Sequence, residues 1–211
     1  MNTKNKALAG LIGHGIQGSL SPMIHETEAK ENGLELIYRI VDFAAPERDA
    51  SFLQNMLLAA ESLDFSGVNI THPYKEDAFK LVDVLSEDAK KIGSINTIIF
   101  KNGKRFGDNT DWFGFSENFK SGISNAEIDI VAQIGTGGAG LAVAYAMLKM
   151  GTNEIHLFDT QKDKANTLAK NLQSMFPDRK IIVSDDVENA LQNAKGIINA
   201  TPIGMEGIPG T

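Results

Sequence analysis

The chain of 211 residues contains no cysteine. Disulfide bonds, thiolate metal sites and thiol nucleophiles are therefore excluded, and any chemistry must use oxygen and nitrogen groups. Basic residues are also in the minority, with 20 Lys and Arg against 27 Asp and Glu and a net charge of −7. Because this charge repels phosphate backbones over most of the surface, we expect no nucleic-acid partner.

Long apolar runs are also missing. The longest uncharged stretch begins at Ile130 and is interrupted by a cluster of glycines, so it is not the apolar helix of about 20 residues that crosses a bilayer. The apolar run Ala7–Ile12 is shorter than the core of a signal peptide. We therefore expect no membrane partner and a cytoplasmic location. The spacing of the four histidines does not suggest a metal site.

Composition and length favour a globular protein of two compact parts. Apolar residues make up 42% of the chain and glycine 20 of its 211 residues, as in ordinary globular proteins. The length fits two units of roughly 100 residues each. We expect one domain over residues 1–111, a linking helix over 112–125 and a second domain over 126–211.

Short apolar runs alternate with amphipathic stretches in the first domain, which predicts an α/β fold with a mostly parallel sheet. A hairpin with an Asn102-Gly103 turn is expected at the edge of this domain. Strands are expected over 7–13, 36–41, 67–71, 94–100 and 104–107, and helices over 22–32 and 48–62.

The second domain opens with an apolar strand over 128–134, followed at once by a glycine-rich loop and a helix that ends at Met150. This order predicts a Rossmann-type, doubly wound dinucleotide-binding domain. Further strands are expected over 154–158, 180–184 and 196–199, and further helices over 162–175 and 187–193.

The glycine-rich loop carries the pattern GxGxxG at Gly135, Gly137 and Gly140. Its glycines suit a tight turn, a close approach to pyrophosphate and helix packing, while the helix N-terminus offers free N–H groups to phosphates. The alternative to a dinucleotide site is that these glycines form a tight turn with a purely structural role. We expect the dinucleotide to contact the whole loop, which comprises Gly135, Thr136, Gly137, Gly138, Ala139 and Gly140.

Asp159 ends the next expected strand, 24 positions after Gly135. A carboxylate at this spacing accepts hydrogen bonds from the adenosine ribose and repels a 2′-phosphate, so we expect NAD in preference to NADP. The nearby Lys162 and Lys164 argue against this, because either could partner a phosphate. An N-cap of the following helix is the structural alternative for Asp159.

Polar residues also follow the expected strands of the first domain, where ligands of open α/β sheets bind. Together with the second domain they form five ordered motifs, namely Ser19-Leu20-Ser21-Pro22, Asn69–Lys75, Gly93–Thr97, Asn109-Thr110-Asp111 and Asn199–Met205. These motifs resemble those of shikimate dehydrogenases, and more closely those of the branch that also accepts quinate.

The resemblance implies an oxidoreductase that moves a hydride between NAD(P) and the C3 position of shikimate or 3-dehydroshikimate, and of quinate or 3-dehydroquinate. By the same resemblance, Ser19 and Ser21 hold the substrate carboxylate, and the ring hydroxyls contact Asn69, Thr71, Asn96 and Asp111. Lys75 matches the catalytic lysine and Asp111 its carboxylate partner. The nicotinamide pocket is lined by Asn199, Thr201, Pro202 and Met205. We expect a monomer or a homodimer.

The chemistry of Lys75 fits this role. Oxidation of a secondary alcohol requires its hydroxyl proton to leave as the carbonyl forms. A lysine with a pKa of about 10.4 is a poor base in water, and a neighbouring carboxylate raises that pKa further. We therefore expect Lys75 and Asp111 to share the proton as a pair, and leave open which of them is formally the base.

Two features depart from the family pattern. Shikimate dehydrogenases continue beyond the position of Thr211, so we expect an incomplete nucleotide domain whose last strand lies at an exposed edge. NADP-using members carry Asn-Arg-Thr where this chain has Asp159-Thr160-Gln161, which agrees with NAD. Trp112 either walls the pocket or packs against a helix.

Two other functions are considered. One is a non-catalytic metabolite-binding or regulatory homologue of the same fold, against which Lys75 and Asp111 argue. The other is a different two-domain NAD dehydrogenase that acts on an amino acid or a folate, which would make the motifs of the first domain a coincidence.

Overall fold

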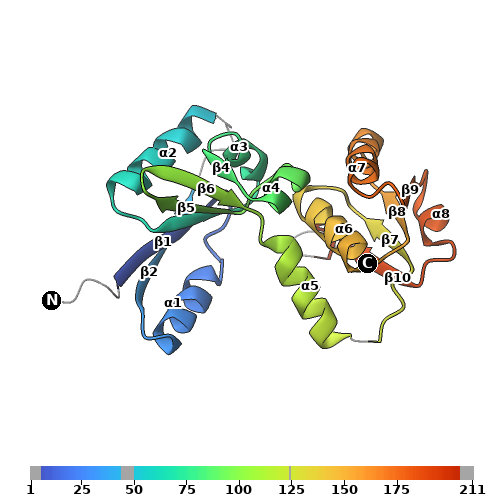
Figure 1. The fold of residues 1–211 in the computed structure, drawn as a ribbon, viewed down its shortest axis with the longest axis horizontal. Coiled ribbons are helices and arrows are strands. Elements are labelled where there is room, and N and C mark those ends of the chain that lie inside the picture. Colours follow the sequence, from blue (N-terminus) through green and yellow to red (C-terminus); the bar gives the residue numbers. More distant parts are fainter. Residues whose placement is uncertain (1–5, 44–49, 124, 205–211) are drawn as a thin grey trace. The chain divides into compact units, whose positions relative to one another are not determined.

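A computed structural model of the protein describes residues 6–43, 50–123 and 125–204. The chain divides after Thr110 into two compact units, residues 1–110 (unit 1) and 111–211 (unit 2) (Figure 1). Each unit contains its own β-sheet and its own helices, and each is described by itself below.

Unit 1 is built on a six-stranded sheet in the order β2-β1-β3-β5-β6-β4. β2, β1 and β3 are parallel, β5 runs antiparallel to both β3 and β6, and β4 is parallel to β6. The expected α/β architecture with a mostly parallel sheet is confirmed. The strands are β1 (Lys6–Gly13), β2 (Glu35–Asp42), β3 (Gly67–Ile70), β4 (Val84–Leu85), β5 (Thr97–Lys101) and β6 (Lys104–Asp108).

One strand of this sheet, β4, was not expected from the sequence, and it pairs with the hairpin formed by β5 and β6. Val84 and Leu85 pair with Phe106 and Gly107, so β4 lies outside β6. A strand of two residues is too short to show the alternation by which strands are identified in a sequence.

Four helices accompany this sheet, namely α1 (Ser21–Glu31), α2 (Ala50–Ser62), α3 (Lys75–Phe79) and α4 (Glu87–Ile92). α1 starts with Pro22 in its first turn, where the missing N–H costs no helical hydrogen bond. Leu53 and Leu57 of α2 are buried in one core with Ile12 of β1 and Ile70 of β3. This core fixes the sheet beneath the loops that follow its strands.

The strand directions gather the polar motifs at one edge of the sheet. β1, β3 and β6 end at this edge, and the antiparallel β5 begins there. The loop after β1, the segment after β3, Asn96 before β5 and Thr110 after β6 therefore lie at the same edge.

Unit 2 begins with α5 (Asp111–Gly122) and contains a parallel sheet in the order β10-β7-β8-β9. Numbered within this unit, the order is 4-1-2-3, the arrangement with which a Rossmann sheet begins. The remaining elements are β7 (Ile130–Ile134), α6 (Gly138–Met150), β8 (Glu154–Phe158), α7 (Lys162–Met175), β9 (Lys180–Val183), α8 (Val187–Leu191) and β10 (Gly196–Asn199).

The sheet of unit 2 reverses its order of growth between β7 and β10, which makes this the switch point where ligands of such sheets bind. α6 follows β7 directly and is almost entirely apolar, with Ala142, Tyr145 and Leu148 buried. β10 lies at the edge of the sheet, as expected, and the side chain of Ile197 is 67% exposed.

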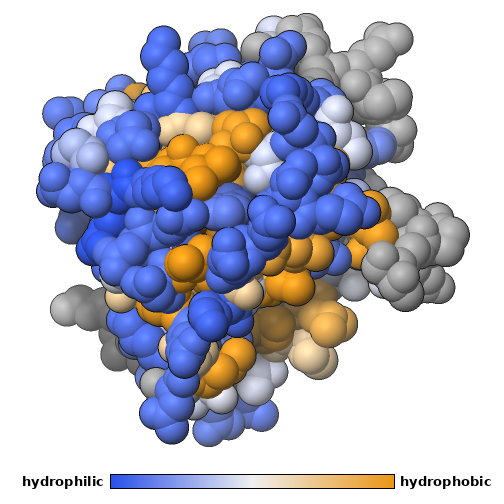
Figure 2. Space-filling view, turned by 90° about the vertical axis from the view of Figure 1, so that its right-hand side faces the viewer, coloured by the Kyte–Doolittle hydropathy of each residue, from blue (hydrophilic) through white to orange (hydrophobic). Residues whose placement is uncertain are grey.

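Figure 2 shows a face of the molecule that is largely hydrophilic, with hydrophobic residues visible in several separate areas. In the part of the chain that the structure describes, no helix is both long and apolar enough to cross a membrane.

Candidate functional site

The loop after β1 is held in place by Asp42 at the end of β2. The Asp42 carboxylate accepts hydrogen bonds from the backbone N–H of Gly15 (2.7 Å) and of Ile16 (2.9 Å). Beyond this loop, the hydroxyl of Ser19 donates to the hydroxyl of Ser21 (3.1 Å) and accepts from its N–H (3.2 Å). Two half-buried hydroxyls therefore lie side by side at the N-terminus of α1, where backbone N–H groups favour an anion.

Asn69 in β3 is oriented by Tyr38 in β2. The Tyr38 hydroxyl donates to Asn69 Oδ1 (2.7 Å), and Asn69 Nδ2 donates to Thr97 Oγ1 (3.1 Å) and to the carbonyl of Asn96 (3.3 Å). Tyr38 is 4% exposed, its ring stacks on His25 of α1, and burial raises the pKa of its hydroxyl to about 12. Tyr38 therefore stays protonated and fixes which way the Asn69 amide faces.

Asn96 joins the start of β5 to the end of β6. Its Oδ1 accepts from the N–H of Thr110 (2.9 Å) and from Thr97 Oγ1 (3.0 Å), and its Nδ2 donates to Thr110 Oγ1 (3.0 Å). The hydrogen bonds of Tyr38, Asn69, Thr97, Asn96 and Thr110 thus form a continuous polar network from β2 to the segment that follows β6.

Lys75 is positioned through its backbone. The N–H of Thr71 donates to the carbonyl of Ile12 (2.9 Å), and the N–H of Tyr74 donates to the carbonyl of Thr71 (3.0 Å). Lys75 follows as the half-buried first residue of α3, and its carbonyl accepts from the N–H of Ile95 (3.1 Å). The segment that carries the lysine is therefore tied to β1 and to the segment before β5.

The structure thus brings six of the seven expected substrate and catalytic residues to one edge of the unit 1 sheet. These six are Ser19, Ser21, Asn69, Thr71, Lys75 and Asn96. The seventh, Asp111, is half-buried as the first residue of α5 and begins unit 2.

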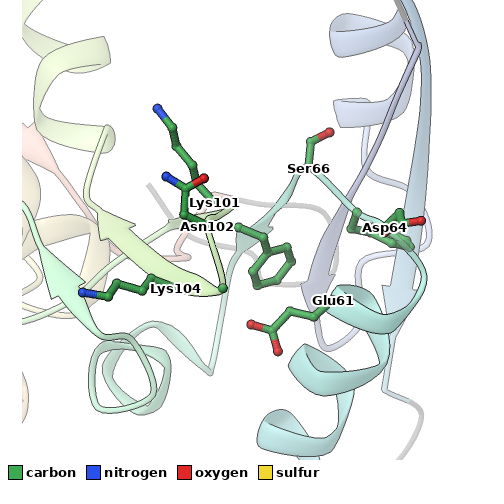
Figure 3. A pocket seen from close by; sticks show the side chains of 9 residues that line it. Glu61, Asp64, Ser66, Lys101, Asn102 and Lys104 are labelled. Carbon is green, nitrogen blue, oxygen red and sulfur yellow. The ribbon is translucent and has the colours of Figure 1, made fainter. Parts of the chain in front are cut away.

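A cavity of about 550 Å³ in unit 1 lies elsewhere. It is bounded by the end of α2, the residues before β3 and the turn between β5 and β6, at the opposite edge of the sheet (Figure 3). Carboxylates of Glu61 and Asp64 and ammonium groups of Lys101 and Lys104 line it, with none of the expected site residues. Glu61 is already engaged in two hydrogen bonds of 2.8 Å with the guanidinium of Arg105.

In unit 2 the glycine loop joins β7 to α6 at the switch point. Gly135 has a positive φ of 97°, and a Cβ there would lie 2.8 Å from the carbonyl of Ala200. A Cβ on Gly140 would lie 2.3 Å from the carbonyl oxygen of Gly135. A Cβ on Gly137 would meet no atom within 4 Å. The packing of the chain therefore requires glycine at Gly135 and Gly140. At Gly137 a side chain would meet open space instead.

A buried glutamine closes this loop. Gln133 in β7 is fully buried, and its Nε2 donates to the carbonyls of Gly135 (2.9 Å) and Gly140 (2.8 Å). The two carbonyls lie at opposite ends of the loop, so one side chain holds both ends. The N-terminus of α6, at Gly137 and Gly138, stays exposed.

Asp159, at the end of β8, contacts the same loop. Its Oδ2 accepts from the N–H and from the hydroxyl of Thr136, both at 2.8 Å, and its Oδ1 accepts from the N–H of Gln161 (2.8 Å). Desolvation raises the pKa of Asp159, but these hydrogen bonds and the charge of Lys164 outweigh it, so that the pKa lies below its ordinary value. The carboxylate is therefore charged at neutral pH. The residue before α7 is Gln161, so Asp159 does not cap that helix.

The turn after β10 lies beside the glycine loop, because a Cβ on Gly135 would touch Ala200 and Thr201. Asn199 Oδ1 accepts from the N–H (3.0 Å) and the hydroxyl (2.6 Å) of Thr201, and its Nδ2 donates to the carbonyl of Ile203 (3.2 Å). Pro202 lies in this turn and is exposed. Met205 lies outside the described residues.

Trp112 packs edge-on against Tyr145 of α6 (5.9 Å between ring centroids), and Lys149 lies 3.8 Å above its ring. Trp112 therefore packs against a helix, which is one of the two roles expected for it from the sequence. Across the described ranges, no group of three or more His, Asp or Glu side chains could hold a metal ion.

Sequence reasoning missed the roles of Tyr38, Thr97 and Gln133. Gln133 could have been noticed, because it places a polar group in an otherwise apolar strand, and a buried polar group needs a partner. The hydroxyl of Tyr38 likewise needs a partner when the ring is buried. Thr97 lies in the motif Gly93–Thr97, but this motif assigned it no role of its own.

Comparison with known proteins agrees with this architecture. A sequence profile described as "Shikimate dehydrogenase substrate binding domain" matches residues 11–98. A curated shikimate dehydrogenase (NADP(+)) of Streptomyces avermitilis is 39% identical over 210 residues, which cover 99% of this chain and 72% of that protein. A quinate/shikimate dehydrogenase (NAD(+)) of Corynebacterium glutamicum (strain R) is 38% identical over 208 residues, covering 97% and 73%.

Among solved structures, a quinate dehydrogenase from Corynebacterium glutamicum in complex with NAD is similar, with a TM-score of 0.89 and 37% identity. The match covers 98% of this chain and 75% of that one. The suggested alternative of a two-domain dehydrogenase from another family is therefore wrong. On its sequence, its fold and the arrangement of its motifs, the chain belongs to the shikimate dehydrogenase family.

Proposed function

We propose that this oxidoreductase transfers a hydride between NAD, in preference to NADP, and the C3 hydroxyl or ketone of shikimate and 3-dehydroshikimate. Quinate and 3-dehydroquinate are proposed as a second substrate pair. The observation that carries the proposal is the gathering of two serines, two asparagines, a threonine and a lysine at one edge of the unit 1 sheet. Polar groups at that edge suit a small polyhydroxylated carboxylic acid.

The proposed contacts of Ser19, Ser21, Asn69 and Asn96 with the substrate use side chains that are already oriented by hydrogen bonds. The paired hydroxyls of Ser19 and Ser21 at the N-terminus of α1 suit a carboxylate. Asn69 and Asn96, fixed by Tyr38 and Thr110, suit the ring hydroxyls together with Thr71. Because these groups need not reorganise on binding, the loss of conformational entropy is small.

We assign proton transfer to Lys75 and Asp111. The substrate hydroxyl loses its proton as the carbonyl forms, and the lysine and the carboxylate share that proton during turnover. The backbone contact between Lys75 and Ile95 supports this assignment, because it ties the lysine to the segment that carries Asn96.

The residues of unit 2 fit a dinucleotide. The open space at Gly137 and the exposed N-terminus of α6 suit the pyrophosphate, the charged Asp159 suits the adenosine ribose, and the turn containing Asn199, Thr201 and Pro202 suits the nicotinamide end. When bound, the nicotinamide ring accepts or donates the hydride. Related proteins are named for NAD and for NADP, so the preference for NAD rests on Asp159.

The direct test is the rate of reduced-cofactor formation with shikimate and with quinate, each offered with NAD and with NADP. We expect turnover with NAD well above that with NADP. If shikimate or NAD raises the thermal unfolding temperature without any turnover, the chain is a binding protein and the enzyme proposal is wrong.

Replacement of Asp159 by Ser is expected to abolish the preference for NAD. The carboxylate loses both its hydrogen bond to the ribose and its repulsion of a 2′-phosphate, so the NAD/NADP ratio of kcat/KM should fall by about tenfold, equivalent to about 1.4 kcal/mol. Asp178→Ser removes an equal charge before β9 and serves as the control. An unchanged ratio in Asp159→Ser would contradict the assignment.

A further inference from the structure

We propose that Thr136 is a positioning residue for cofactor choice, because it holds the Asp159 carboxylate in the orientation that discriminates against a 2′-phosphate. The inference rests on the proposed function and adds a second specificity-determining residue to Asp159. It follows from the contacts between the glycine loop and the end of β8.

Thr136 contacts Asp159 through two of its groups. Both the N–H and the hydroxyl of Thr136 donate to Asp159 Oδ2 at 2.8 Å. Any residue at this position supplies the N–H, whereas the hydroxyl comes from the choice of threonine. Hydrogen bonds to an ionised group are about twice as strong as those between neutral groups, so the hydroxyl matters energetically.

Three hydrogen bonds from the protein occupy acceptor positions of the Asp159 carboxylate. A carboxylate has about four lone-pair sites, two on each oxygen. Thr136 fills both sites on Oδ2, and the N–H of Gln161 fills one on Oδ1. One site remains, on Oδ1. Asp159 is therefore prepared to accept a single hydroxyl hydrogen bond, rather than the two that an unencumbered carboxylate could accept.

These contacts also hold the Asp159 carboxylate rigid. Thr136 is 7% exposed, so its hydroxyl has little access to water as an alternative partner, and its β-branched side chain is stiff about χ1. Held at one oxygen by Thr136 and at the other by Gln161, the carboxylate cannot rotate away from a ligand. A fixed negative charge repels a phosphate fully, whereas a mobile one can turn toward a cation such as Lys164, whose charge already acts on Asp159.

A purely structural role for Thr136 makes a different prediction. If the hydroxyl only ties the loop to β8, its loss loosens the whole phosphate-binding loop. The affinities for NAD and NADP would then fall together and their ratio would stay the same.

The experiment compares dissociation constants for NAD and for NADP by isothermal titration calorimetry, without substrate, in the full chain. In Thr136→Val, which keeps the shape and removes the hydroxyl, we expect NAD to bind three- to tenfold more weakly. The NADP/NAD ratio of dissociation constants should fall at least threefold. Thr136→Ser keeps the hydroxyl and should retain the ratio within twofold. Thr167→Val, in α7, makes the same chemical change away from the loop and should alter neither constant.

Thermal unfolding of each variant establishes that it is folded, and Thr136→Ala replaces Thr136→Val if valine prevents folding. Equal weakening of both cofactors, or an unchanged ratio in the folded hydroxyl-free variant, would overturn the role of Thr136. A wild-type chain that binds NAD no better than NADP would overturn the proposed preference and this inference with it. A wild-type preference that survives loss of the hydroxyl would overturn the inference alone.

Discussion

Lys75→Ala is expected to lower kcat by about 100- to 10,000-fold, the range contributed by a positioned group that transfers a proton. Substrate binding should weaken far less, because Ser19, Ser21, Asn69 and Asn96 would remain. The fold should also survive, since the contact that ties this residue to Ile95 uses the backbone carbonyl, which alanine keeps. Steady-state kinetics with shikimate and NAD, with substrate binding followed by calorimetry, measures both effects.

Lys80→Ala is the matched control. Lys80 follows α3, is exposed and lies 3.5 Å from the carboxylate of Asp77, an ion pair of a kind that contributes little to stability. The variant removes the same charge from the other end of the same short helix and should keep wild-type turnover. If Lys75→Ala keeps turnover within threefold of wild type, Lys75 is not the proton-transferring residue.

Gly137→Ala is expected to weaken NAD binding by at least tenfold and to leave the thermal stability of the chain nearly unchanged. The backbone of Gly137 has an ordinary φ of −70°, and a Cβ there would touch no atom of the chain. A methyl group would instead occupy the space through which the pyrophosphate approaches the N-terminus of α6. Calorimetric titration with NAD and thermal unfolding give the two quantities.

The comparison variant is Gly140→Ala, three positions further along the same loop and helix. Its methyl group would lie 2.3 Å from the carbonyl of Gly135 and 2.9 Å from Gln133 Nε2, so the loop would have to shift. We expect a loss of about 1–3 kcal/mol in the free energy of unfolding, the usual effect of overpacking. If Gly137→Ala binds NAD as wild type does, the open space there does not serve the pyrophosphate.

The sequence predicted the fold of unit 2 closely. Strand Glu154–Phe158, helix Lys162–Met175 and strand Gly196–Asn199 begin and end where the pattern of apolar residues predicts. Each combines a clear period with a turn or glycine at its boundary. In unit 1 the same reasoning did not predict α4 and β4, because elements of two to six residues are too short to show a period.

The candidate site could be predicted only in part. The motifs named the residues at the strand ends, but not the contacts that orient them. Tyr38 and Asn69 are 31 positions apart, and only the parallel pairing of β2, β1 and β3 brings them together. The contact between Thr136 and Asp159 depends in the same way on the pairing of β7 with β8.

The reversed direction of β5 has a consequence for the order in which the protein folds. The β5–β6 hairpin closes over the two residues Asn102 and Gly103, and it brings Asn96 to Thr110 through contacts that are local in sequence. The pairing of β1 with β3, by contrast, joins Ile12 to Ile70 and must close a much longer loop. Local contacts form faster than distant ones. We therefore expect the hairpin to bring Asn96 and Thr110 together first, and the segments that follow β1 and β3 to join them when the parallel strands pair.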